Sequence, residues 1–372
     1  MNKFRTLEFN QYLLYNLFQI QEDLIARSYA PGDFERFIVY EPKERNIEAP
    51  AFKDKIVLHV ITDNGLYDAI THSFIRNNCA NQLCKGISDA IVRMKRCLMK
   101  YYSTYNTSEG WILKCDIRHF FASINHDVIK EKLKKVCIRS NIDKEIYDLL
   151  CIYIDKTDGL PLGYQTSQLL ALLMLDDLDH FITERKHFPL YVRGMDDFVI
   201  IGPDKRELQI LLTEIRKELD KIHLELNEKT AIFPIRNGVD FLGYHHYLIE
   251  SGAVIQKLRK SAVKREKQKI KQWKYLYENH EITAEQIMAS FQAWDAYASF
   301  GDTYQLRRTL ADKVEEITGV PVIIHRKRNS TVIQRAIRRD KMSKAIAEKN
   351  RLAFEKNATY SDLNTPPWEE RN

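Results

Sequence analysis

Two adjacent carboxylates, Asp196 and Asp197, are the side chains of this sequence best suited to metal chemistry. They stand between two β-forming runs, Tyr191-Val192 and Phe198 to Ile201, which predict two strands joined by a turn at the acids. Burying a carboxylate in apolar surroundings costs on the order of several kcal/mol unless a cation compensates it. The pair is therefore a candidate for two ligands of a divalent cation. An ordinary exposed Asp-Asp turn remains open as the alternative.

A third carboxylate stands at the end of another predicted strand. The run from Trp111 to Ile117 is apolar and contains Asp116, and an acid at the end of a central strand is held rigidly while still meeting solvent. Asp176, Asp177 and Asp179 are not expected to join it. They follow an apolar helical pattern, and neighbouring helical side chains diverge by about 100°.

The remaining pattern supplies the elements that must position these acids. Helical periodicity marks residues 1 to about 30, most of 51–105, 169–181 and 205–222, and a short strand is predicted at 37–40. Residues 224–235 and 239–244 predict a second hairpin.

Two cations and a glycine-rich loop suggest sites for phosphate. Lys43 and Arg45 would share one face of an extended segment, although two solvated charges remain the alternative. In the loop at 158–168, Gly163 permits close approach of a ligand to the backbone. The helix that follows offers an N-terminus, which favours anions.

The charge distribution indicates a polyanionic partner. The chain of 372 residues has a net charge of only +6, but residues 257–278 contain nine Lys or Arg against two Glu, and residues 325–344 contain eight against one Asp. Six lysines recur in steps of three and four and predict one helical stripe, with a solvated face as the alternative. They are Lys257, Lys260, Lys264, Lys267, Lys271 and Lys274.

Cysteine usage and hydropathy give an expectation about location. The six cysteines include no Cys-x-x-Cys pair and no signal peptide precedes them, so they are expected to be reduced thiols. No run approaches the roughly 20 apolar residues of a membrane span. We expect a soluble, cytoplasmic protein without a membrane partner.

Taken in order, these motifs resemble the reverse transcriptases, and bacterial retroelement enzymes in particular. The resemblance covers about residues 10 to 310 and implies an α+β, right-hand polymerase fold. Fingers with an N-terminal helix would occupy 1–110, and a palm with an antiparallel sheet and part of the fingers would occupy 111–250. A helical thumb would follow at 251–318 and a basic extension at 319–372.

The resemblance also implies roles for individual residues. Asp116, Asp196 and Asp197, with Ile117, would hold two Mg²⁺ ions, and Lys229 would be a general-acid candidate near the leaving group. Nucleotide binding would involve Lys43, Arg45, Leu162, Gly163 and the steric gate Phe121, which favours deoxynucleotides. Primer and template would meet Gly194, Met195, the primer grip Phe241-Leu242-Gly243, and the thumb lysines Lys260, Lys264, Lys267 and Lys271.

One loop resembles a particular subgroup. Leu162-Gly163 and Ser167-Gln168 stand where most reverse transcriptases have Gln-Gly and Ser-Pro, as in the diversity-generating retroelement enzymes. In that group an aliphatic residue in place of Gln accompanies mispairing at template adenines, and loss of a polar side chain would remove a hydrogen-bond constraint on the nascent pair.

One residue departs from the family pattern. Gly194 replaces an aromatic residue, and this change fits relatives in antiphage defence. The implied function is RNA-directed DNA synthesis from dNTPs, in a retroelement or in defence. A catalytically decayed nucleic-acid-binding protein is the alternative. Expected partners are an RNA template or structured RNA, a DNA primer and product, and an accessory protein or a second copy of the chain.

Overall fold

The computed structural model describes residues 3–40 and 44–325, with side chains from Thr6 onward. The chain divides into two compact units between Arg259 and Lys260. Lys43, one of the two predicted phosphate-binding cations, lies outside the described residues. The first unit contains two buried apolar cores and the second unit contains one.

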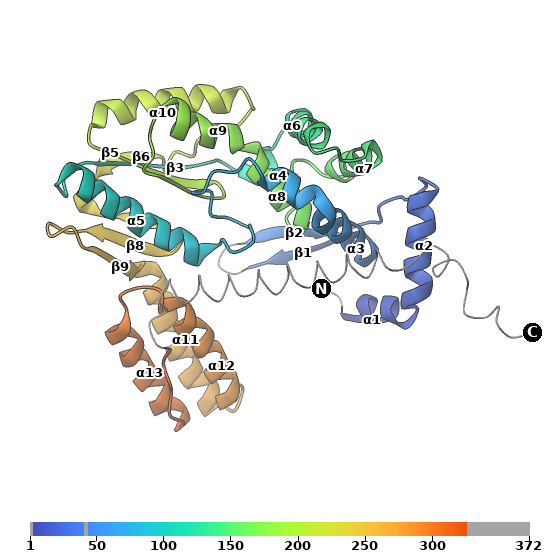
Figure 1. Cartoon of the computed structure of the whole chain (residues 1–372). Helices are drawn as coiled ribbons and strands as arrows, with labels where there is room; N and C mark the ends of the chain where they lie inside the picture. The colour runs from blue at the N-terminus through green and yellow to red at the C-terminus, as the bar shows by residue number, and fades with distance from the viewer. Residues whose placement is uncertain (1–2, 41–43, 326–372) are drawn as a thin grey trace, which may run out of the picture. The chain divides into compact units, whose positions relative to one another are not determined.

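A four-stranded antiparallel sheet, called the central sheet below, forms the middle of the first unit (Figure 1). Its strands run in the order β4-β5-β3-β6. Their bounds are β3 (Trp111–Asp116), β4 (Tyr191–Gly194), β5 (Asp197–Gly202) and β6 (Ala231–Pro234). The strand ending at Asp116 and the hairpin around the Asp-Asp turn are therefore confirmed.

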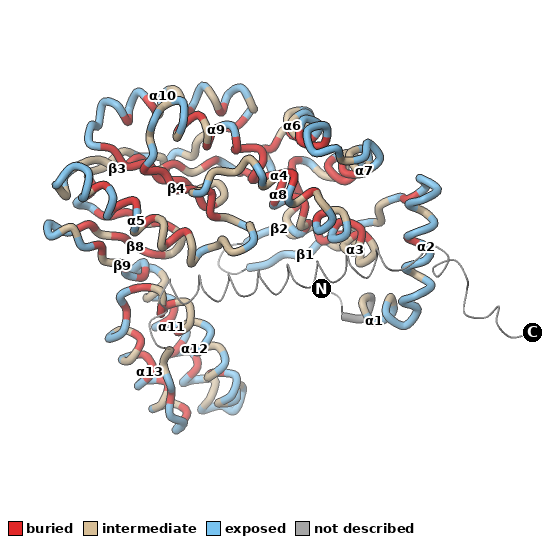
Figure 2. Tube along the Cα trace, in the orientation of Figure 1, coloured by how far each residue is buried: buried red, intermediate tan, exposed pale blue. Residues whose placement is uncertain are grey.

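The central sheet is buried on both faces, because its side chains alternate between two apolar cores. Figure 2 colours much of this sheet as buried. One face sends Leu113, Cys115, Tyr191, Phe198 and Ile200 into the first core. The other sends Ile112, Val192, Val199 and Ile201 into the second. Helix α10 (Lys205–Asp220) covers the first face and α5 (Ile87–Tyr105) the second (Figure 1).

A second, smaller sheet packs against α5 and contains β7 (Val239–Phe241), β8 (Tyr244–Leu248) and β9 (Val254–Leu258). The predicted hairpin between residues 224–235 and 239–244 is wrong. β6 pairs with β3 in the central sheet, whereas β7 pairs with β8. A short 3-10 turn, η4 (Ile235–Asn237), and Gly238 at φ +68° redirect the chain between the two sheets.

The other elements of the first unit flank these sheets. The predicted strand at 37–40 is one half of a hairpin between β1 (Glu35–Val39) and β2 (Arg45–Ala49). The N-terminal helical pattern is two helices, because Tyr12 leaves the helical conformation. Before β3 lie α1 (Lys3–Gln11), α2 (Leu13–Ile25), α3 (Phe52–Ile61), the π-helical η1 (Thr62–Leu66) and α4 (Tyr67–Thr71).

Helices between β3 and β4 complete the first core. The pattern predicted at 169–181 begins earlier, at Gln165, and is interrupted at Leu175. The segments are the 3-10 turn η2 (Phe120–Ser123), α6 (His126–Arg139), α7 (Lys144–Ile154), α8 (Gln165–Met174), α9 (Asp176–His180) and the π-helical η3 (Phe181–Arg185).

The described part of the second unit, up to residue 325, contains α11 (Lys260–Glu278), α12 (Ala284–Ala298) and α13 (Tyr304–Thr318) around a core that includes Trp273 and Phe291. The lysine stripe is shorter than predicted. Lys257 belongs to β9, and its ammonium lies over the Tyr247 ring, so five of the six lysines lie on α11. Those five side chains are exposed.

Two expectations concern membrane and redox chemistry. Within the described ranges, no helix is both long and apolar enough to cross a bilayer. All six cysteines are free thiols.

Candidate active site

The three predicted carboxylates gather at one end of the central sheet. Asp116 on β3 lies directly opposite Asp197 on β5, and Asp197 lies opposite Gly194 on β4. Residues that face each other across antiparallel strands point to the same side of the sheet. Asp196 lies in the two-residue turn, next to Met195, whose positive φ of +71° makes the turn tight. The exposed-turn alternative is not what the structure contains, because all three acids are partly buried.

Burial and neighbouring negative charge raise the pKa of two of these carboxyl groups, Asp196 and Asp197. Burial is the largest cause of the raised pKa of Asp196, and the nearby Asp116 charge adds to it, while Arg45 and Arg193 oppose the shift. Burial raises the pKa of Asp197 to about 6; Lys114 lowers it, and the other two acids raise it. A cluster of desolvated, mutually repelling carboxylates is stabilised by bound cations or protons.

Lys114 already supplies one cation to this cluster. Its Nζ lies 3.3 Å from Oδ2 of Asp197 and donates a 2.6 Å hydrogen bond to the backbone carbonyl of Asp240. The other oxygen of Asp197, Oδ1, is buried without a hydrogen-bond partner among the described residues. Such an orphaned carboxylate oxygen is a ready cation ligand.

The three carboxylates have the ligand chemistry that a divalent metal ion requires. Carboxylate oxygens are the hard ligands that Mg²⁺ prefers. Within residues 3–40 and 44–325, however, no three acidic, His or Cys side chains are already arranged to hold a metal ion.

A fully buried ion pair supports the Asp-Asp turn from the opposite face of the sheet. Arg193 donates from Nε and Nη2 to the two oxygens of Asp179, at 2.7 and 2.5 Å, and from Nη1 to the Met195 carbonyl at 2.9 Å. Tyr191 donates to the same carboxylate at 2.5 Å. Asp179 thus pairs with Arg193 and fixes the arginine that holds the turn.

The β1–β2 hairpin brings Arg45 close enough to affect Asp196 electrostatically. The amide of Glu48 on β2 donates to the Leu162 carbonyl at 3.1 Å, which joins this hairpin to the glycine loop. Gly163 adopts φ +135°, and a Cβ there would lie 2.9 Å from the Glu48 carbonyl oxygen. The glycine is therefore required by backbone approach within the chain.

Phe121 lies in η2, five residues beyond Asp116, with its ring against Phe120 at 5.7 Å between centroids. Its carbonyl accepts a hydrogen bond from the Leu160 amide at 2.8 Å. A Cβ on Gly159 would clash with that carbonyl at 2.4 Å, so the glycine loop packs tightly on the turn that carries Phe121.

Ile117 and Lys229 lie near the end of β3. Ile117 is buried and forms an isolated antiparallel bridge with Leu226. The amide of Asn227 donates to the Asp116 carbonyl at 2.7 Å, and the Asn227 side chain caps the amide of Lys229 at 3.1 Å. Lys229 is exposed in this turn, two residues from the backbone contact with Asp116.

Gly194 meets the predicted primer grip. Phe241 is buried at the end of β7, and Leu242-Gly243 form the turn to β8, both with positive φ. A Cβ on Gly194 would lie 2.9 Å from Cδ1 of Leu242. The leucine side chain therefore fills the space beside residue 194 where the family pattern places an aromatic ring.

Lys260, Lys264, Lys267 and Lys271 lie on α11, which belongs to the second unit, whereas the residues described above belong to the first. Sequence reasoning missed Lys114 and Arg193. Both are charged residues inside otherwise apolar strands, and that position was the available signal, since a buried charge requires a partner.

Comparison with known proteins places this site in context. Residues 45–246 match the family described as reverse transcriptase (RNA-dependent DNA polymerase). No curated protein matches the sequence. Solved structures with similarity include telomerase from Candida albicans in complex with a telomeric RNA fragment, at 13% identity and a TM-score of 0.48, covering 80% of this chain and 60% of that one.

Two further structures are similar. Apo telomerase from Candida tropicalis has 15% identity and a TM-score of 0.49, covering 83% of this chain and 65% of that one. The Sicinivirus RNA-dependent RNA polymerase has 12% identity and a TM-score of 0.48, covering 86% and 70%. The chain thus spans less than two thirds of the length of these telomerase chains.

Proposed function

The chain belongs to the reverse transcriptase family, whose members are nucleotidyltransferases that copy RNA into DNA, and we propose that Asp116, Asp196 and Asp197 are its catalytic carboxylates. The observation that carries this proposal is the register that sets Asp116 opposite Asp197 with Asp196 beside them. Their mutual repulsion and the orphaned oxygen of Asp197 favour occupation by divalent cations, proposed to be two Mg²⁺ ions.

Bound metal would activate the primer 3′-hydroxyl and neutralise the leaving pyrophosphate. The chain's own residues would position the substrates. Arg45 contacts the triphosphate, together with Lys43. The backbone at Leu162 and Gly163 borders the base pair between the template and the incoming nucleotide. Ile117 supports the metal site through its backbone. Lys229 is the proposed general acid.

The proposed function implies a hand-shaped architecture. Residues 1–110 would be the fingers, 111–250 the palm and 251–318 the thumb. Phe241, Leu242 and Gly243, with Gly194 and Met195, would contact the primer terminus. The exposed lysines of α11, Lys260, Lys264, Lys267 and Lys271, would contact the phosphates of the template-primer duplex.

We assign the chain's biological context to a bacterial retroelement of the diversity-generating type or to antiphage defence. Leu162-Gly163 and Ser167-Gln168 support the first, and Gly194 fits the second. The partner is a template or structured RNA, with an accessory protein or a second copy of the chain as a further partner. Sequencing DNA made on copurified RNA separates the roles, because errors at template adenines and repetitive untemplated DNA are different products.

The decisive experiment measures DNA extension by the full chain on a primed RNA template with dNTPs and Mg²⁺. We expect Asp196→Asn to lower incorporation by about a thousandfold or more, because it removes a charge that the metal requires. Asp177→Asn is the matched control: it changes an acid on α9 that pairs with Lys132, outside the site.

Equal incorporation by wild type and Asp196→Asn would reject the assignment of this carboxylate. Binding of the duplex by wild type without any metal-dependent incorporation would favour a decayed, nucleic-acid-binding protein instead.

Phe121 gives a separate test of substrate choice. If its ring excludes a ribose 2′-hydroxyl, Phe121→Ala should raise the incorporation of rNTP relative to dNTP by about tenfold or more. The measurement is the ratio of kcat/KM for matched rNTP and dNTP. An unchanged ratio would assign sugar discrimination to another residue.

A further inference from the structure

The Lys114 side chain contacts both a proposed catalytic carboxylate and the small sheet. It lies on β3 two residues before Asp116, so both side chains point to the same face of the central sheet. Its ammonium lies 3.3 Å from Oδ2 of Asp197 and 2.6 Å from the Asp240 carbonyl. A lysine ammonium has three donors and no acceptor, so it can bind both oxygens at once.

We propose that Lys114 is a positioning residue for the polymerase reaction. It holds one oxygen of Asp197 and fixes the β7–β8 hairpin against the catalytic end of the central sheet, so that Asp197 offers its other oxygen to a divalent cation. This inference rests on the proposed function, because it assumes that Asp197 is a metal carboxylate.

The two oxygens of Asp197 differ in the way this role requires. Oδ2 is paired with the ammonium, whereas Oδ1 is buried without a partner in the described part of the chain. The Lys114 side chain is 24% exposed and the Asp197 side chain 21%, so solvent only partly screens the attraction between their charges. Lys114 therefore repels an incoming cation while it orients the ligand that receives it.

The hairpin end of the contact is also well anchored. The Asp240 carboxylate hydrogen-bonds Nδ1 of His245 at 2.6 Å and accepts from Nε of Arg259 at 3.0 Å. The amide of Arg259 donates to the Gly243 carbonyl at 3.1 Å. Lys114 thus binds the carbonyl of Asp240. The carboxylate of this β7 residue contacts His245 on β8 and Arg259 just after β9. Lys114 joins this assembly to Asp197.

This role predicts opposite effects on metal binding and on catalysis. Lys114→Met removes a positive charge beside Asp197, so Mn²⁺ should bind the full chain about tenfold more tightly in the absence of nucleotide and nucleic acid. The same variant frees Asp197 and the hairpin, so kcat for single-nucleotide incorporation should fall by about tenfold or more. A purely structural lysine would lower metal affinity and activity together.

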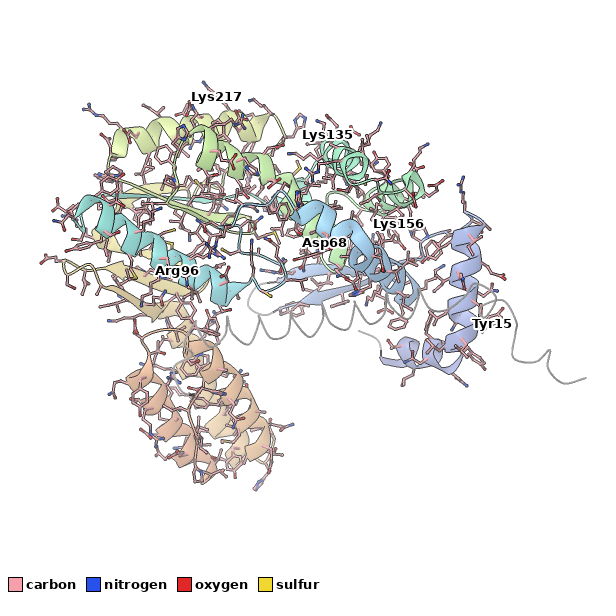
Figure 3. All side chains as sticks on the ribbon, viewed as in Figure 1. Tyr15, Asp68, Arg96, Lys135, Lys156 and Lys217 are labelled. Atoms are coloured by element: carbon pink, nitrogen blue, oxygen red, sulfur yellow. The ribbon has the colours of Figure 1, made fainter. Side chains whose placement is uncertain are left out.

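The experiment titrates each full-length variant with Mn²⁺ at pH 8, follows free Mn²⁺ by electron paramagnetic resonance, and measures incorporation separately at saturating Mg²⁺. Lys114→Arg keeps the charge and should stay within about threefold of wild type in Mn²⁺ affinity. Lys217→Met, which removes an exposed lysine on α10 (Figure 3), is the matched control for loss of one charge. Lys114→Gln supplies the same readouts if the Met variant does not fold.

Tighter Mn²⁺ binding with slower incorporation supports the proposal. Unchanged or weaker Mn²⁺ binding in both neutral variants overturns it. If wild type itself neither binds Mn²⁺ nor incorporates nucleotides, the proposed function fails instead, and the two failures are thereby distinguished.

Discussion

The two faces of the central sheet each carry a charged pair among apolar residues, and the pairs differ in completeness. On one face Arg193 and Asp179 are fully buried, and both carboxylate oxygens accept hydrogen bonds. On the other, Lys114 and Asp197 remain partly exposed, and one carboxylate oxygen has no partner in the described chain. A satisfied pair fixes structure, whereas an unsatisfied one keeps the capacity to bind something else.

The two faces also differ in how their aspartates are paired. Asp177 and Asp179 each have a cation of their own, Lys132 and Arg193. Asp116, Asp196 and Asp197 instead lie near one another, and the pKa values of Asp196 and Asp197 are raised although Arg45, Arg193 and Lys114 lower them. The number of acidic residues in a segment is therefore a poorer indicator of a metal site than whether each acidic side chain already has a paired cation.

The largest effect is expected where the satisfied pair is broken. Arg193→Met leaves Asp179 charged and buried, which should lower the free energy of unfolding by about 3–5 kcal/mol. Urea unfolding of the full chain at pH 7.5 measures this loss.

The double variant Arg193→Met/Asp179→Leu is the matched control, because it removes both charges and should recover part of the lost stability. It should not recover incorporation, since Met195 has lost the hydrogen bond to its carbonyl. A double variant no more stable than Arg193→Met would show that charge burial is not the cause.

A smaller effect is expected at Lys114 and Asp197, where the stability of the folded protein should depend on pH. Asp197 has a pKa of about 6 in the folded protein against 3.8 as an ordinary side chain. The folded state therefore holds this proton more tightly than the unfolded state, and the resulting stabilisation is present near pH 4 and lost as the pH rises through 6. We expect this loss in wild type treated with EDTA and not in Asp197→Asn.

Urea unfolding of both proteins between pH 4 and 8 tests the expectation. Parallel pH profiles for wild type and Asp197→Asn would contradict it and would imply that Asp197 is as well satisfied as Asp179.

The smallest loss of stability is expected at Gly194, which lies in sequence between Arg193 of the satisfied pair and Asp197 of the unsatisfied pair. Gly194→Ala places a methyl group 2.9 Å from Cδ1 of Leu242, and the end of this side chain can shift, so the loss of stability should be about 1 kcal/mol. Thermal unfolding measures it. Leu242→Ala in the same chain should offset the loss; an additive loss would mean that the two side chains do not compete for space.

The positions of the three carboxylates could be predicted from the sequence, because the apolar runs beside them indicate strands. Asp116 at the end of an apolar strand and Asp196-Asp197 between two strands follow from local alternation, and the family match agrees with the predicted polymerase fold. The pairing of β6 and β7 could not be predicted, because both segments have strand patterns and only their distant partners distinguish them. Lys114 and Arg193 have partners 83 and 14 positions away in sequence, which local spacing does not reveal.

The contact between Gly194 and Leu242 couples the choice of residue at these two positions. A Cβ at 194 would lie 2.9 Å from the end of the Leu242 side chain, which can shift to admit a methyl group. An aromatic ring at 194 would need much more of the volume that Leu242 occupies. A large side chain at 194 therefore requires a smaller or displaced side chain at 242, and the two positions must be varied together.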